Sequence, residues 1–194
     1  PRPDERHIRY TDVVELAKAL HVEFNVEGYP SEDFLALVTD VKPAQVTLVP
    51  DPPDAITSNA GWDTKMNRQQ LKDVISRLKE AGIRTSIFLD PDPRLVEHAH
   101  ETGTDRIELY TESYADNYRK DRESAVAAYV STADQALKYD LGINAGHDLN
   151  LENLAFFSER VPGLLEVSIG HALISDALYY GIENTIQMYL RCLK

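Results

Sequence analysis

The sequence predicts an α/β fold, a (β/α)8 TIM barrel, on the strength of three observations. Short β-rich apolar runs alternate with longer stretches of helical periodicity along the 194 residues, which is typical of a parallel sheet wrapped by helices. Two predicted helices end in a glycine, at Gly82 and Gly103, and turn directly into a strand. Polar residues gather where the predicted strands end, which is the active face of such barrels.

Six strands and seven helices are predicted in alternating order. The strands cover residues 21–27, 45–50, 84–89, 106–111, 142–146 and 166–170. The helices cover about 10–19, 31–40, 67–81, 93–102, 119–140, 151–159 and 173–193. No low-complexity linker or block of charge divides the sequence, so we expect residues 1–194 to form one domain. Because a closed barrel needs eight strands, we expect an N-terminal strand–helix–strand portion of about 45 residues to be missing from this chain.

Composition favours a compact cytoplasmic enzyme. Apolar residues make up 43% of the chain, which is enough for one substantial core. The single cysteine, Cys192, allows no intrachain disulfide and no thiolate metal cluster, and this fits a reducing compartment. The sequence has no run of about 18 apolar residues that could cross a membrane. Its 20 Lys and Arg against 32 Asp and Glu give a net charge of −12, which repels nucleic acid and anionic membranes.

The first predicted strand ends in a carboxylate that we expect to act as a general base. Alternation along residues 21–27 places Glu23 and Glu27 towards the barrel axis and the apolar residues, Val22 and Val26 among them, towards the helices. Partial desolvation at the active face would raise the pKa of Glu27 towards the range useful for a base. A structural ion pair is the alternative for Glu27, and it is our interpretation of Glu23, which lies deeper.

Later strands also end in groups that can move protons or bind phosphate. Glu108 alternates with apolar neighbours and is expected to point into the barrel, with a buried ion pair as the alternative. His147 and His171 each follow a glycine at a strand end. The loops after the last two strands of such barrels often bind phosphate through backbone N–H groups and a helix N-terminus. A capping or packing role is the alternative for each histidine.

Other segments carry weaker signals. The polar segment 51–65 is the longest loop after a strand, and such loops are commonly lids, with a plain surface excursion as the alternative. His98 and His100 lie on different sides of a predicted helix, so we interpret both as surface residues without a shared metal. The sequence has no P-loop, GxGxxG, HExxH or paired CxxC motif, which removes the usual support for nucleotide, dinucleotide or thiolate-zinc sites.

Several motifs in order along the chain resemble the pyridoxine 5′-phosphate synthase family. They are RPDERHI at 2–8, FNVE at 24–27, LVP at 48–50, TSNAGWD at 57–63, RIELYT at 106–111, NAGHDL at 144–149 and IGHALI at 169–174. The resemblance covers essentially the whole chain. It implies condensation of 1-deoxy-D-xylulose 5-phosphate with 3-amino-2-oxopropyl phosphate to pyridoxine 5′-phosphate, phosphate and water. It also implies that no metal or organic cofactor is needed, and that the chains assemble into dimers and then an octamer.

The resemblance further implies a role for individual residues. Glu27 matches the family's general base, His147 its proton donor, and Glu108 a carboxylate that stabilises a transition state. The residues implied to bind the substrates and their phosphates are Arg2, His7, Thr57, Asp148, Gly170 and His171. Some relatives have glycine at position 148, so we expect the backbone N–H of Asp148 to contribute rather than its side chain. The family's other site residues lie in a segment outside this chain.

Two other functions stay open on sequence alone. One is another phosphate-binding barrel, such as an isomerase or an aldolase acting on a sugar phosphate. A Schiff-base aldolase would need a lysine at a strand end, and no predicted strand ends in one. The other is a non-catalytic metabolite sensor or scaffold, which would not need carboxylates and imidazoles at one face. We therefore expect an enzyme with small phosphorylated substrates.

Overall fold

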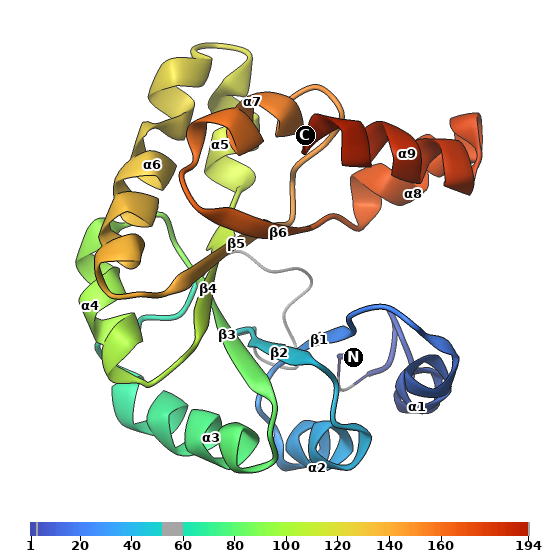
Figure 1. The fold of residues 1–194 in the computed structure, drawn as a ribbon, viewed down its shortest axis with the longest axis vertical. Coiled ribbons are helices and arrows are strands. Elements are labelled where there is room, and N and C mark those ends of the chain that lie inside the picture. The colour runs from blue at the N-terminus through green and yellow to red at the C-terminus, as the bar shows by residue number, and fades with distance from the viewer. Residues whose placement is uncertain (3, 52–59, 194) are drawn as a thin grey trace. The chain divides into compact units, whose positions relative to one another are not determined.

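The computed structural model describes residues 1–2, 4–51 and 60–193, and strands alternate with helices as predicted (Figure 1). The strands follow one another in the sheet in chain order, and the pairs β1–β2, β2–β3 and β5–β6 are parallel. The elements are α1 (Tyr10–Ala19), β1 (Asn25–Gly28), α2 (Glu32–Val41), β2 (Gln45–Leu48), α3 (Arg68–Glu80), β3 (Arg84–Leu89), α4 (Pro93–Glu101), β4 (Arg106–Tyr110), α5 (Glu112–Tyr118), α6 (Arg122–Lys138), β5 (Gly142–Gly146), α7 (Leu154–Arg160), β6 (Leu164–Ser168), α8 (His171–Tyr180) and α9 (Ile182–Cys192).

The contacts of the chain group into two compact units. The first unit is Pro1–Asp90 with His98–Ile107, and the second is Pro91–Glu97 with Glu108–Lys194. Each unit is described by itself, and the expectation of a single domain stays a prediction. Among the described residues, no helix is both long enough and apolar enough to span a membrane.

The first unit packs helices against one face of its strands and keeps polar side chains on the other. On β2, Val46 and Leu48 are fully buried in the apolar core, and the residues between and before them, Gln45 and Thr47, are also fully buried. A strand buried on both faces is typical of parallel sheets covered by helices. The core-facing residues of α3, Leu71, Ile75 and Leu78, recur at helical spacing and are buried with them.

Hydrogen bonds and an ion pair connect several polar groups on the second face of this sheet. Arg84 Nε donates to Gln45 Oε1 at 2.8 Å, and the same guanidinium forms an ion pair with Glu23. Thr47 Oγ1 donates to Asn25 Oδ1 at 3.2 Å. The interpretation of Glu23 as a structural ion-pair partner is therefore confirmed.

The first predicted strand is shorter than the sequence suggested. Its ladder with β2 begins at the pair Asn25–Gln45, so residues 21–24 precede the strand, and the side chain of Val22 is 73% exposed. Period-2 alternation correctly places Val26 in the core, where it is buried. The prediction that Val22 faces the helices is wrong, because without ladder hydrogen bonds the chain has no pleat to fix that alternation.

An aromatic cluster in the second unit anchors the end of β4. The rings of Tyr114, Tyr129 and Phe157, from α5, α6 and α7, pack edge to face with centroids 4.9–5.8 Å apart. The Tyr129 hydroxyl donates to the carbonyl of Tyr110 at 2.8 Å and accepts the N–H of Tyr114 at 3.2 Å. The helix α5 was not predicted, because its seven residues are too few to show a clear period.

The second strand ends at Leu48, two residues earlier than predicted, and further differences lie near the C-terminus. The predicted helix 173–193 is two helices, α8 and α9, separated at Gly181, whose φ of +77° a helix does not accept. The two helices pack side by side (Figure 1). The last strand runs from Leu164 to Ser168, two residues earlier than predicted. The predicted turns at Gly82 and Gly103 are confirmed, since both have φ near +80°.

Candidate functional site

The buried carboxylate of Glu108, a residue in the middle of β4, lies against the last residue of β5. Glu108 is 1% exposed, although charged residues are almost never fully buried without interactions that compensate the charge. A Cβ atom added to Gly146, the last residue of β5, would lie 2.3 Å from Glu108 Oε1 and 3.1 Å from Ser168 Cβ. Only glycine therefore leaves room for this carboxylate. The prediction that Glu108 points inwards agrees with its burial.

Thr111, the residue that follows β4, ties the turn after β5 to the end of β4. Its N–H and its Oγ1 both donate to the carbonyl of Gly146, at 3.2 and 2.7 Å. The same Oγ1 accepts the N–H of Asp148 at 3.2 Å. One threonine thus holds the peptide groups on both sides of His147.

His147 adopts a backbone conformation that side chains rarely accept. Its φ is +101°, and such conformations cost a non-glycine residue on the order of 1–3 kcal/mol, so the surrounding contacts must enforce them. Its N–H donates to the carbonyl of Ser168 at 3.1 Å, which adds a contact to β6. Strain of this kind clusters at functional sites.

The imidazole of His147 is oriented by a carboxylate and by aromatic neighbours. Its Nδ1 lies 2.8 Å from Asp148 Oδ2, and the two side chains are 24% and 36% exposed. The ring of Tyr110 meets it edge to face at 5.4 Å, and the ring of His171 lies 6.2 Å away. An ionised carboxylate only accepts hydrogen bonds, so a carboxylate in this place favours a hydrogen on Nδ1 and leaves Nε2 as the ring nitrogen for other partners.

The structure brings His147 and His171 together, as the paired Gly-His turns suggested. His171 is the first residue of α8 and Gly170 precedes it as the N-cap. Gly170 is exposed, and a Cβ added to it would meet no atom within 4 Å. The start of α8 therefore offers backbone N–H groups on an accessible surface, which is the usual setting for a bound phosphate.

The contribution of Asp148 differs from the one expected from sequence. We expected its backbone N–H to bind phosphate, but this N–H donates to Thr111. The positive φ of His147 turns the following peptide in that direction. The side chain of Asp148, for which no role was expected, is the part that contacts a predicted catalytic residue.

In the first unit, Arg2 and Glu27 lie at the carboxyl ends of β1 and β2. Arg2 Nη2 contacts the carboxylate of Asp51, just beyond β2, at 3.2 Å.

Two of the predicted residues in this unit are exposed, and a third cannot be placed. Glu27 is exposed, so the expected partial desolvation of its carboxylate is wrong within the described structure. His7 is exposed in the turn before α1. Thr57 lies outside the described residues, as does most of the predicted lid, and the closing of that loop stays a prediction.

The described end of the predicted lid is fixed to the strand ends of the first unit. Trp62 Nε1 donates to the carbonyl of Leu48 at 2.9 Å, and its N–H donates to the carbonyl of Phe88 at 2.8 Å. The N–H of Gly61 donates to Asp90 Oδ1 at 2.8 Å. Asp51 and Asp90 thus serve local contacts at the ends of β2 and β3.

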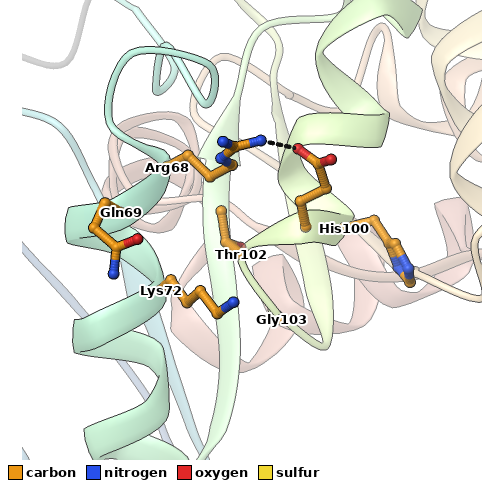
Figure 2. Close-up of a pocket in the computed structure, with 7 residues that line it drawn as sticks. Arg68, Gln69, Lys72, His100, Thr102 and Gly103 are labelled. Carbon is orange, nitrogen blue, oxygen red and sulfur yellow. Dashed lines mark hydrogen bonds and ion pairs between the residues drawn. The ribbon is translucent and has the colours of Figure 1, made fainter.

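A separate hollow of about 590 Å³ lies between α3 and the end of α4 (Figure 2). Arg68 and Glu101 form an ion pair of 2.8 Å at its edge. Thr102 and Gly103, also in its lining, belong to the turn that enters β4 at its amino end. None of the predicted site residues lines this hollow, so we do not take it as the active site. Among the described residues, no group of three or more His, Cys, Asp or Glu is placed to hold a metal ion.

Comparison with known proteins gives one family over the whole chain. The family model described as pyridoxal phosphate biosynthesis protein PdxJ matches residues 1–194. The chain is 58% identical to the pyridoxine 5′-phosphate synthase of Bacteroides thetaiotaomicron and 60% identical to that of Christiangramia forsetii, over all of this chain and 82% of each relative.

Solved structures of lower sequence identity share the fold. The phosphoribosylanthranilate isomerase of Thermotoga maritima superposes with a TM-score of 0.61 at 16% identity, over 97% of this chain and 81% of that one. The tryptophan synthase A-subunit of Pyrococcus furiosus gives 0.60 at 15% identity, over 94% and 70%. These likenesses show a TIM-barrel-like α/β fold and nothing of the activity.

Proposed function

This chain belongs to the family of pyridoxal phosphate biosynthesis protein PdxJ, and from that membership we propose that it is a pyridoxine 5′-phosphate synthase. In the proposed reaction, 1-deoxy-D-xylulose 5-phosphate and 3-amino-2-oxopropyl phosphate condense to pyridoxine 5′-phosphate, phosphate and water. The observation that carries the proposal is the oriented imidazole of His147 beside the strand end that holds the buried carboxylate of Glu108.

The proposed chemistry needs proton transfers around carbonyl groups. Addition of an amine, loss of water and an aldol-type ring closure each require one group that removes a proton and another that delivers one. We assign the first task to Glu27 and the second to His147. A carboxylate and an imidazole differ in intrinsic pKa, so they can hold opposite protonation states at neutral pH. Glu108 would stabilise charge that develops in the transition state.

The substrates carry phosphate groups, and this acidic protein must attract them locally. The exposed turn at Gly170 and His171 presents the N-terminus of α8, where helix dipoles and N–H groups favour anions. Arg2 offers a guanidinium at the other candidate cluster, with Asp51 as its neighbour. We assign Gly170, His171, Arg2, His7 and Thr57 to the binding of substrate and phosphate.

The complete fold, the cellular location and the oligomeric state belong to the same proposal. We propose that its strands belong to an eight-stranded barrel in the complete enzyme, that it acts in the cytoplasm, and that its chains assemble into dimers and then an octamer. The similar fold of the TIM-barrel-like solved structures supports the first point, and sedimentation measures the last.

Product formation from both phosphates tests the function directly. The protein is incubated with 1-deoxy-D-xylulose 5-phosphate and 3-amino-2-oxopropyl phosphate, and fluorescent pyridoxine 5′-phosphate is measured. Glu27→Gln and His147→Asn keep the shape of each side chain but remove its proton chemistry. Each should lower kcat by about 10²–10⁴-fold with little change in KM.

Glu23→Gln is the matched control, because Glu23 lies near the same strand but serves the ion pair with Arg84. It should lower thermal stability and leave kcat near that of the wild type. If Glu27→Gln behaves in the same way, with lower stability and normal kcat, Glu27 is not the base. If the wild-type protein forms no pyridoxine 5′-phosphate, the proposed function is wrong.

A further inference from the structure

The side chain of Asp148 is unsuited to the phosphate-binding role that its position suggested. A carboxylate repels phosphate, and its backbone N–H is already directed at Thr111. Its Oδ2 instead lies 2.8 Å from Nδ1 of His147. A carboxylate on one ring nitrogen fixes which nitrogen carries the hydrogen and how the ring is turned.

Thr111 acts on the same histidine through the main chain. Its hydroxyl donates to the carbonyl of Gly146 at 2.7 Å and accepts the N–H of Asp148 at 3.2 Å, so it bridges the two peptide groups around His147. Thr111 is fully buried, and the two peptide groups that it holds flank His147, the residue with a φ of +101°. Without the hydroxyl, the turn would lose two of the contacts that oppose its relaxation to a commoner conformation.

We propose that Asp148 and Thr111 are positioning residues for His147: Thr111 holds its backbone in the strained turn, and Asp148 accepts the Nδ1 hydrogen, so that the doubly protonated ring delivers its other proton from Nε2 to the substrate. This inference rests on the proposed function, in which His147 delivers a proton. Neither residue needs to touch the substrate. Misplacing a reacting group by about 1 Å can cost about 10²-fold in rate, so both residues should affect kcat rather than substrate binding.

The first test pairs a disruptive with a conservative change at each position. Asp148→Ala removes the acceptor of the Nδ1 hydrogen, whereas Asp148→Asn keeps an oxygen in its place. Thr111→Val removes the hydroxyl but keeps the shape, and Thr111→Ser keeps the hydroxyl. We expect Asp148→Ala and Thr111→Val to lower kcat by about 10–100-fold with KM for both phosphates within about twofold, and the conservative changes to restore most of kcat.

The second test reads the histidine ring itself. In protein labelled with ¹⁵N-histidine, the ring nitrogen shifts report which nitrogen carries the hydrogen, and His147→Asn identifies the His147 signals among the 6 histidines. The wild type should show the Nδ1–H form, and Asp148→Ala should lose it. Glu101→Gln is the matched control, because Glu101 contacts Nδ1 of another histidine, His98, at 3.2 Å and is not one of the predicted site residues. This change should alter neither the His147 signals nor kcat.

The outcomes separate this inference from the function on which it rests. An increase in KM with normal kcat in Asp148→Ala would show a substrate-binding role and overturn the inference, as would an unchanged Nδ1–H signal. Failure of Thr111→Ser to recover activity lost in Thr111→Val would overturn the role of the hydroxyl. Absence of product with wild-type protein would refute the function alone, because the ¹⁵N spectra judge the positioning of His147 independently.

Discussion

Replacing Gly146 by alanine should place a methyl group against the carboxylate of Glu108. The added Cβ would lie 2.3 Å from Glu108 Oε1, whereas ordinary contacts are about 3.5 Å. The carboxylate would therefore have to move by about 1 Å. Its other neighbour, Ser168 Cβ at 3.1 Å, leaves little room for the methyl group to turn away. Overpacking of this size costs about 1–3 kcal/mol of stability.

The catalytic effect should exceed what the lost stability explains. Displacement of a catalytic group by about 1 Å can cost about 10²-fold in kcat, so we expect a loss of that order in pyridoxine 5′-phosphate formation by the folded variant. Leu78→Ala is the control for stability, because it empties a buried site on α3 at a cost of about 2–5 kcal/mol and should leave kcat near normal.

A double-mutant cycle assigns the effect to the contact between the two residues. Glu108→Asp shortens the side chain and makes room for the methyl group, so it should harm the Gly146→Ala variant less than it harms the wild type. Additive losses in kcat would mean that the methyl group acts elsewhere. Gly146→Ala with kcat within about twofold of the wild type would refute the proposed role of the Glu108 carboxylate in catalysis.

Two further predictions concern stability. Tyr129→Phe should lower the free energy of unfolding by about 1–3 kcal/mol, because it removes the hydroxyl that donates to the buried carbonyl of Tyr110. Urea unfolding measures this free energy, and an unchanged midpoint and slope would contradict the prediction. Burial raises the pKa of the Asp105 carboxyl, but hydrogen bonds from Lys79 and Thr85 together lower it by more than burial raises it. The folded pKa of Asp105 therefore lies below the usual value. A carboxyl with a lowered folded pKa stabilises the folded protein at pH values above its unfolded pKa of about 3.9, and this stabilisation is lost as the pH falls through the folded pKa. Asp105→Asn should therefore destabilise the protein at pH 7 and progressively less in acid. A difference in unfolding free energy between wild type and variant that does not change with pH would count against this prediction.

The local patterns of the sequence were sufficient for most of the secondary structure. Alternation and helical periodicity predicted the bounds of α1, β3 and β5, since each combines a clear period with a definite start or end. The errors have physical causes. The region of β1 was predicted too long because pairing with β2, rather than propensity, decides where a strand begins. The short helix α5 is held by tertiary contacts of Tyr114 and Tyr129, which no local pattern reports.

The chemistry of the candidate site divides in the same way. Residue types and their places at strand ends were enough to single out Glu108, His147 and His171, because the carboxyl ends of parallel strands form the active face. The sequence could not show that Asp148 turns its carboxylate to His147 or that Thr111 bridges the peptides around it. These contacts depend on the positive φ of one histidine and on the meeting of β4 with β5, which only the folded chain fixes. Sequence determined which groups are available for catalysis, and tertiary structure decided how they are held, because orientation is a property of contacts between residues far apart in the chain.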